Sequence, residues 1–253
     1  MAARRQRLDA ELVRRALVVS RTEAVGLIDD RRVLVNGAVA DKASRQVHPG
    51  DAVVVVDGPP RFVSRGGEKL DAALTVFDLD VTGCRALDVG ASTGGFTDCL
   101  LQRGAAHVVA IDVGHGQLHP RIRDDGRVSV LERFHVRDLE RSAIGGPVDL
   151  AVADLSFISV TKALAPITGV LDPGASMVLL VKPQFEAGRS EVSKGRGVIT
   201  DPDVHQRVCA EVEQALSAAG CTVHAWTDSP ILGGDGNREF LVHATWEGSV
   251  FPA

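Results

Sequence analysis

The sequence predicts an α/β protein in which a mostly parallel, seven-stranded sheet is wound with helices and preceded by a small α+β domain. Three observations lead to this fold class. Apolar strand segments alternate with helical segments from residue 66 onward. A glycine-rich turn at residues 90–95 follows the first of these strands. The break Asp57-Gly-Pro-Pro60 separates this region from a basic N-terminal segment.

Composition sets limits on the class of protein. A chain of 253 residues with 45% hydrophobic residues can bury a full core. It contains no run of 18 apolar residues, and its first residues lack the apolar core of a signal peptide. The four cysteines form no CxxC pair, so neither a zinc site nor a disulfide framework is predicted. We therefore expect a cytoplasmic protein that has no metal and no membrane partner and acts as a monomer.

The N-terminal domain is predicted to span residues 1–58. Leu8 to Ala16 have helical spacing, and the capping box Ser20-Arg-Thr-Glu23 begins a second helix. A hairpin with an Asn-Gly turn is expected over residues 33–39, and a further strand over 53–56. Residues 59–65 are predicted to be a linker, and 66–253 to be the second domain.

The N-terminal domain is basic on an acidic chain. Residues 1–60 carry 10 Lys/Arg against 8 Asp/Glu, although the whole chain has a net charge of −5. This asymmetry is typical of a protein that meets an anionic partner at one end, although a solvated tail would show it too. The segments Arg7-Leu-Asp9, Ser20-Arg21, Val35-Asn-Gly37, Lys42 and Pro49-Gly-Asp51 resemble the αL-type RNA-binding module first described in a ribosomal protein. That resemblance implies phosphate contacts from Arg4, Arg5, Arg7, Arg14, Arg15, Arg21, Arg32 and Lys42.

The second domain has seven candidate strands, at 85–90, 107–113, 128–132, 148–154, 175–182, 222–228 and 239–246. Helices are predicted at 67–78, 94–103, 158–168 and 202–219, the last between an Asp201 N-cap and Gly220. The final two strands have no helix between them, so we expect them to pair antiparallel.

The glycine turn, Asp88-Val-Gly90-Ala-Ser92-Thr-Gly-Gly95-Phe96, predicts a nucleotide-type cofactor beside exposed backbone amides. A dinucleotide fingerprint would have glycine where Ser92 stands, and Asp88 would repel a pyrophosphate. S-adenosylmethionine has a sulfonium and an ammonium instead, so these residues favour it. Asp112 closes the next strand, where a ribose-binding acid is expected in either case. The predicted cofactor contacts are Asp88, Gly90, Ala91, Ser92, Thr93, Gly94, Gly95, Phe96, Asp112 and Asp154.

The next two strands end in charged residues. Asp154 ends the strand that begins at Val148, and Lys182 ends the strand Ser176–Val181. Since ligands bind beyond the carboxyl ends of parallel strands, the two charges are expected at the site. Neither an Asn/Asp-Pro-Pro-aromatic turn nor a suitably placed cysteine is present, as base methylation would require. A lysine–aspartate pair suits activation of a hydroxyl in line with a methyl group.

At this point the chain resembles the ribose 2′-O-methyltransferases with a Lys-Asp-Lys-Glu tetrad, and over its whole length the TlyA family, whose members are also named hemolysins. The most specific segments are Ser64–Leu70, Asp88–Phe96, Arg103–Val109, Val152–Ile158 and Val181–Phe185. The resemblance implies a Rossmann-like class I methyltransferase that acts on cytidine riboses of 16S and/or 23S ribosomal RNA within small and/or large ribosomal subunits. The tetrad maps to Lys69, Asp154, Lys182 and Glu239.

Two further features were predicted less narrowly. His135-Val136 stands where relatives tend to have a small polar residue near the adenine, so the adenine pocket stays loosely assigned. The loop 186–198 is expected to be either a mobile basic lid over RNA or a solvated loop. Its Arg189, Lys194 and Arg196, together with Arg65, complete the predicted RNA contacts. A membrane-active hemolysin, a non-catalytic ribosome-assembly factor and a base methyltransferase stay open as alternatives.

Overall fold

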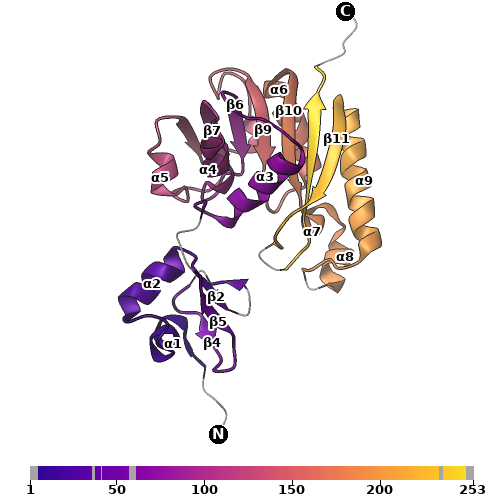
Figure 1. The fold of residues 1–253 in the computed structure, drawn as a ribbon. Helices are drawn as coiled ribbons and strands as arrows, with labels where there is room; N and C mark the ends of the chain where they lie inside the picture. Colours follow the sequence, from indigo (N-terminus) through magenta and orange to yellow (C-terminus); the bar gives the residue numbers. More distant parts are fainter. Residues whose placement is uncertain are drawn as a thin grey trace, which may run out of the picture. The chain divides into compact units, whose positions relative to one another are not determined.

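The computed structural model describes residues 5–35, 38–40, 42–56, 61–195, 197–233 and 236–248 (Figure 1). Within these ranges, the side chains of residues 38, 39, 189, 190 and 194 are not described. The chain divides into two compact units, residues 1–61 and 62–253. Each unit has its own hydrophobic core, so each is treated separately below.

The N-terminal unit is a small α+β fold. Helix α1 (Leu8–Arg14) contacts α2 (Arg21–Asp29), which the Ser20 hydroxyl caps by accepting the Glu23 N–H at 3.1 Å. The strands form two small sheets: β3-β2-β5 (Ala38–Val39, Val33–Val35 and Val53–Val55) and β1-β4 (Gln6–Arg7 and Gln46–Val47). β2 and β3 pair antiparallel, which confirms the predicted hairpin, and its Asn36-Gly37 turn lies outside the described residues. Leu8, Leu12 and Ile28 are fully buried in the core.

The larger unit contains a seven-stranded sheet in the order β11-β12-β10-β9-β6-β7-β8. Strands β6 to β10 are parallel, and β12 runs antiparallel to both of its neighbours. The predicted fold class and the antiparallel pairing of the last two strands are therefore confirmed. The strand bounds are β6 Arg85–Val89, β7 His107–Asp112, β8 Val128–Glu132, β9 Val148–Ala153, β10 Leu171–Val181, β11 Cys221–Asp228 and β12 Phe240–Trp246.

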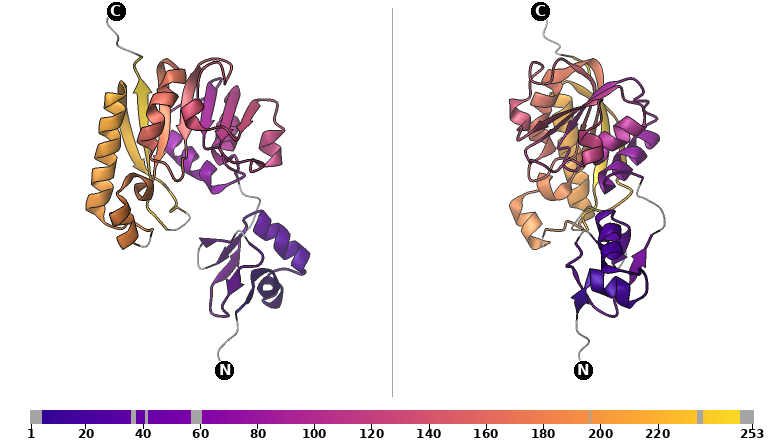
Figure 2. Two further views of the ribbon diagram at one scale, coloured as in Figure 1. Left: turned by 180° about the vertical axis from the view of Figure 1, so that it is seen from behind. Right: turned by 90° about the vertical axis from the view of Figure 1, so that its left-hand side faces the viewer.

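Helices cover both faces of this sheet (Figure 2). On one face, α3 (Arg65–Val76) and α4 (Gly95–Gln102) bury Leu70, Leu74 and Leu100. On the other face, α6 (Leu164–Val170) and α9 (Pro202–Ala218) bury Ile167, Val208 and Val212. The remaining helical segments are α5 Pro120–Arg123, η1 Val136–Asp138, η2 Val160–Ala163, α7 Pro183–Glu186 and α8 Arg189–Lys194.

Three boundaries differ from the sequence prediction. Phe62, placed in the predicted 59–65 linker, is 3% exposed in the core of the larger unit, and Arg65 already begins α3. β10 begins at Leu171 rather than at residue 175. The segment 186–198, expected to be a loop, contains α8, because Glu191 accepts the N–H of Gly188 and so caps a short helix.

Candidate active site

The glycine turn connects β6 to α4 at the carboxyl edge of the sheet. Gly90 has φ +87°, and a Cβ there would lie 2.7 Å from the carbonyl oxygen of Asp154, so no side chain fits. Gly94 has φ +93° and is the N-cap of α4. The N–H of Ser92 donates to Asp112 Oδ2 at 2.8 Å, and that of Gly114 donates to Oδ1 at 2.6 Å. The turn and the end of β7 are thus fixed to each other.

A cavity of about 540 Å³ opens beside this turn, which is a usual size for a cofactor site. Two carboxylates, Asp112 and Asp154, line it, and none of its described lining residues is Lys or Arg. An acidic, partly apolar cavity suits a cationic ligand and disfavours a pyrophosphate. The other lining residues include Gly90, Ser92, Gly114, Gln117, Phe134, His135, Val136, Ser156 and Phe157.

Asp88 does not lie where the sequence analysis placed it. Its residue is fully buried behind the turn, it does not line the cavity, and its Oδ2 accepts the Thr97 hydroxyl at 2.6 Å. Burial raises the pKa of this carboxyl to about 7, although the bond from Thr97 opposes the rise. Oδ1 has no hydrogen-bond partner among the described residues. Asp88 keeps one free acceptor oxygen but does not line the cavity, and its contact with the ammonium of a cofactor stays a prediction.

Other residues predicted to contact the cofactor also make structural contacts within the protein, and their cofactor contacts stay predictions. A Cβ at Gly95 would lie 2.2 Å from Ser64 Oγ, so this glycine permits α3 and α4 to pack closely. Phe96 and Ala91 are buried in the core of the same face. Thr93 bonds His119 through its carbonyl oxygen. Thus only Gly90, Ser92, Asp112 and Asp154 of the predicted set line the cavity.

Lys182 and Asp154 form an ion pair at the edge of the cavity. Lys182 Nζ lies 2.5 Å from Asp154 Oδ1, and it donates to Ser156 Oγ at 3.0 Å. The lysine side chain is 10% exposed and that of Asp154 is 23% exposed. Because the apolar strand β10 leads directly to Lys182 and β9 leads to Asp154, parallel pairing of the strands brings the two charges together.

Lys69 and Glu239 form a second pair, and both are buried. Lys69 Nζ on α3 donates to Glu239 Oε2 at 2.5 Å, with side-chain exposures of 8% and 3%. Val181 pairs with Phe240 at one end of the β10–β12 ladder. Lys182 and Glu239, which are the chain neighbours of these two residues, therefore lie just beyond that end. The structure therefore brings all four tetrad residues to the same edge of the sheet.

Several residues near the cavity were not predicted. The ring of Phe157 is 93% exposed at φ +68° and lies 5.5 Å from the ring of Phe185. Asn237 is buried and bonds both Gly197 and Ile199, so it fastens the end of the 186–198 segment beside Glu239. Asp154-Leu-Ser-Phe157 was noted in the sequence, but the exposure of its aromatic ring depends on a backbone angle that the sequence does not reveal.

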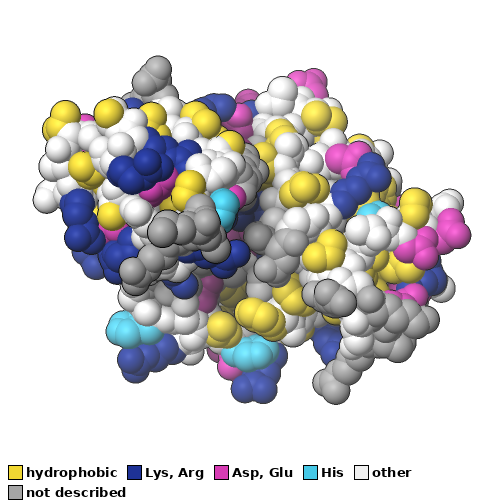
Figure 3. All heavy atoms as spheres, turned by 90° about the horizontal axis from the view of Figure 1, so that it is seen from below, with side chains coloured by type: hydrophobic (Ala, Val, Ile, Leu, Met, Phe, Trp, Pro, Cys, Tyr) yellow, Lys and Arg dark blue, Asp and Glu magenta, His cyan; other side chains and the backbone are white. Residues whose placement is uncertain are grey.

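The predicted RNA-binding arginines fall into different environments. Asp9, which is 2% exposed, accepts from Arg7 and Arg21, and these bonds, that of Arg7 foremost, lower its pKa to about 2. Arg32 bonds the Val56 carbonyl. On the face shown in Figure 3, several Lys and Arg side chains likewise lie next to carboxylates. Arg5 and Lys42 are exposed, and Arg65 is half-buried on α3, whereas Arg4, Arg196 and the side chains of Arg189 and Lys194 lie outside the described residues.

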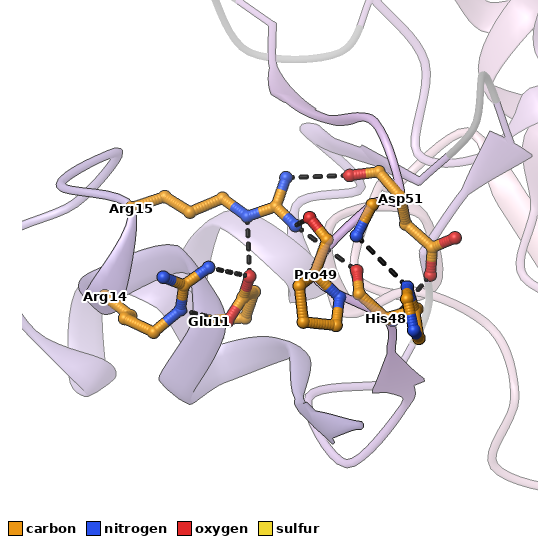
Figure 4. A network of polar contacts seen from close by, with 7 residues as sticks. Glu11, Arg14, Arg15, His48, Pro49 and Asp51 are labelled. Atoms are coloured by element: carbon orange, nitrogen blue, oxygen red, sulfur yellow. Dashed lines mark hydrogen bonds and ion pairs between the residues drawn. The ribbon is translucent and has the colours of Figure 1, made fainter. Parts of the chain in front are cut away.

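Arg14 and Arg15 share one buried carboxylate but differ in role (Figure 4). Both donate to Glu11, which is 1% exposed. Arg15 also donates to the carbonyls of Asp51, Pro49 and His48, at 2.7, 3.0 and 3.4 Å. The side chain of Arg14 is 51% exposed, and that of Arg15 only 20%. Arg15 therefore ties α1 to the 48–51 turn, and its contact with a phosphate stays a prediction.

Comparison with known proteins agrees with this geometry. Residues 62–246 match the FtsJ-like methyltransferase family, and residues 6–53 match the S4 domain. The fold and the site thus define an FtsJ-like methyltransferase, and the chain belongs to that family. A 16S/23S rRNA (cytidine-2′-O)-methyltransferase TlyA of Mycobacterium tuberculosis is 48% identical over 95% of this chain and 90% of its own length. The chain is accordingly a member of the TlyA group.

The hemolysin name also occurs among relatives. Hemolysin A of Brachyspira hyodysenteriae is 39% identical over 94% of this chain and 98% of its own length. A solved structure from Streptococcus thermophilus, whose name places it with the hemolysins, is 37% identical with a TM-score of 0.76, covering 98% of this chain and 90% of its own. In the described part of this chain, every helix is too short or too polar to cross a membrane.

Proposed function

We propose that this chain uses S-adenosylmethionine to methylate the 2′-hydroxyl of a cytidine ribose in ribosomal RNA. The observation that carries the proposal is the Lys182–Asp154 pair at the edge of an acidic cavity. The relatives named as rRNA (cytidine-2′-O)-methyltransferases support the substrate, and the S4 match supports RNA as the partner.

The cavity residues fit the proposed cofactor. Asp112, held by two backbone N–H groups, keeps lone pairs free to accept from ribose hydroxyls. Ile111, Val136 and Leu155 supply apolar walls for an adenine, and Gly90 leaves its backbone open. When bound there, S-adenosylmethionine supplies a methyl group on an electrophilic sulfonium.

The tetrad residues would act on the acceptor. The Lys182 ammonium, fixed between Asp154 and Ser156, would donate to the 2′-oxygen and lower the pKa of that hydroxyl, whose proton would pass to solvent as the oxygen accepts the methyl group. Asp154 holds Lys182 in position, and the buried Lys69–Glu239 pair supports the adjacent end of the ladder. Phe157 presents an exposed ring on which the target base can stack. Positioning supplies most of the acceleration because the donor is already reactive.

The test is to incubate unmethylated ribosomal subunits with labelled S-adenosylmethionine and to map the label. We expect label on a cytidine ribose. Lys182→Met should lower kcat by about 10²–10⁴-fold with cofactor affinity unchanged within about twofold. Lys162→Met, which removes an exposed lysine of η2, is the control. Label on a base atom, or near-normal turnover of Lys182→Met, would refute the proposal.

A further inference from the structure

The segments that follow β9 and β10 are joined side chain to side chain beyond the catalytic pair. Lys182 donates to Ser156, and the rings of Phe157 and Phe185 are in contact. Glu186, the last residue of α7, makes the outermost link. The two segments therefore form one unit, although they come from different parts of the chain.

Glu186 holds this unit through two hydrogen bonds. Its Oε2 accepts the Ser159 hydroxyl at 2.5 Å, and its Oε1 accepts the Val160 N–H at 2.8 Å. Val160 is the first residue of η2, so the carboxylate satisfies one of the free N–H groups at the start of that helix. Glu186 is partly buried, and this burial raises the pKa of its carboxyl, although the bonds from Ser159 and Val160 oppose the rise. Glu186 begins the segment 186–198, for which a mobile lid or a solvated loop is predicted, and its own side chain is anchored.

The segment between the two anchors has a strained backbone. Phe157 has φ +68°, a region that non-glycine residues enter at a cost of roughly 1–3 kcal/mol. Such a conformation persists only where the surrounding contacts fix it. Asp154 fixes the segment at its start and Glu186 fixes it at its end, so the exposed ring between them has a defined position.

We propose that Glu186 is a positioning residue: by anchoring Ser159 and Val160, it holds Ser156 against Lys182 and presents Phe157 to the acceptor nucleotide. The acceptor's identity rests on the proposed function, but the anchoring does not. The hydrogen-bond partners of Glu186 in the described part of the chain, Ser159 and Val160, are not among the residues that line the cavity, so its loss should impair use of RNA and spare cofactor binding.

The experiment compares Glu186→Ala, Glu186→Gln and Ser159→Ala in the full chain. Glu213→Ala is the matched control, because it removes a carboxylate of α9 that accepts a hydrogen bond from Trp226 of β11. The measurements are kcat/KM for ribosomal subunits, the Kd for S-adenosylmethionine, and hydrogen exchange of residues 155–160 and 86–95. Exchange reports on the anchoring whether or not the protein methylates RNA.

We expect Glu186→Ala to lower kcat/KM for RNA by about 10²-fold, since a misplacement of about 1 Å has this effect. Exchange should rise at 155–160 and stay unchanged at 86–95, with cofactor Kd within about twofold. Glu186→Gln, which keeps an acceptor for Val160, should recover most of the activity, and Ser159→Ala should be intermediate. Three results would each overturn the proposal. Glu186→Ala could show the same hydrogen exchange at 155–160 as Glu213→Ala, it could lose cofactor binding in parallel with activity, or Glu186→Gln could fail to recover activity. An inactive wild-type enzyme with the expected exchange pattern would instead refute the proposed function.

Discussion

Replacing Arg15 by alanine tests whether this arginine is structural, as the geometry indicates, or an RNA contact, as its position in the basic segment predicted. The change removes hydrogen bonds to Glu11, Asp51 and Pro49 of 3.0 Å or less, and a weaker one to His48. We assign about 1 kcal/mol to each of the three shorter bonds, below the range for charged partners because part of the side chain is exposed. The expected loss is therefore about 3 kcal/mol.

That loss is large for this unit. A domain of about 60 residues is rarely more stable than about 3–5 kcal/mol, so Arg15→Ala should leave the N-terminal unit close to unfolding. Arg14→Ala is the matched control, because Glu11 keeps Arg15 and the Arg14 side chain is half exposed. Arg14→Ala should lower the free energy of unfolding of this unit by less than about 1 kcal/mol.

The assay is urea unfolding of the full chain, monitored by hydrogen exchange in residues 5–56, together with RNA affinity as a function of salt. Arg14→Ala should leave exchange unchanged and reduce the slope of log K against log salt by about 1, as loss of one phosphate contact does. Arg15→Ala should increase exchange throughout the unit. If Arg15→Ala were as stable as Arg14→Ala and reduced the salt slope by the same amount, the structural role would be refuted.

Three further predictions concern other parts of the chain. Gly90→Ala should weaken S-adenosylmethionine binding at least about tenfold, because the added Cβ meets the Asp154 carbonyl. Gly83→Ala is also at positive φ but has open space around it, so it should lower the stability of the fold without weakening cofactor binding. Equal calorimetric affinities of the two variants for S-adenosylmethionine would contradict this. Lys69→Met and Glu239→Gln should each lower the free energy of unfolding by about 3–5 kcal/mol, because each leaves a buried charge unpaired. The double variant should lose clearly less than the sum of the two single variants, and additive losses of unfolding free energy would refute the coupling. Hydrogen bonds from arginines lower the pKa values of Asp9 and Glu11 to about 2. The two carboxylates therefore stabilise the folded unit above about pH 5, and this stabilisation is lost as the pH falls towards 2. Arg7→Ala should move the titration midpoint of Asp9, followed by NMR, back towards 3.8.

The larger fold was predictable because its signals are local. Each parallel strand is a short apolar run, and the Asp201 N-cap and Gly220 mark the ends of α9 within a few residues. The same reasoning placed Asp154 and Lys182 together, since each directly follows a strand and parallel strands end at one edge. Strand ends are therefore the part of a site that sequence analysis reaches most directly.

How deeply each acidic side chain lies within the site could not be predicted from the sequence. Asp88 and Asp112 both stand at the ends of neighbouring strands, yet one is enclosed behind the turn and the other lines the cavity. Asp88 is the next-to-last residue of β6 and pairs with Ala110, two residues before Asp112, so it lies deeper in the sheet, where the Thr97 hydroxyl donates to it. A one-residue change in where a strand ends decides which side chain meets a ligand, and periodicity does not resolve that.

The neighbouring residues Arg14 and Arg15 show why charge alone does not define an RNA-binding surface. Arg14 and Arg15 are adjacent, equally basic and bonded to the same Glu11, and only the carbonyls of a turn more than 30 residues away distinguish them. A guanidinium whose donors are used by backbone oxygens holds the fold together, whereas one with half its side chain in solvent can still meet a phosphate. The same reasoning applies to Glu186, an acidic residue in a basic segment, whose partly buried bonds to Ser159 and Val160 are the basis of its proposed positioning role.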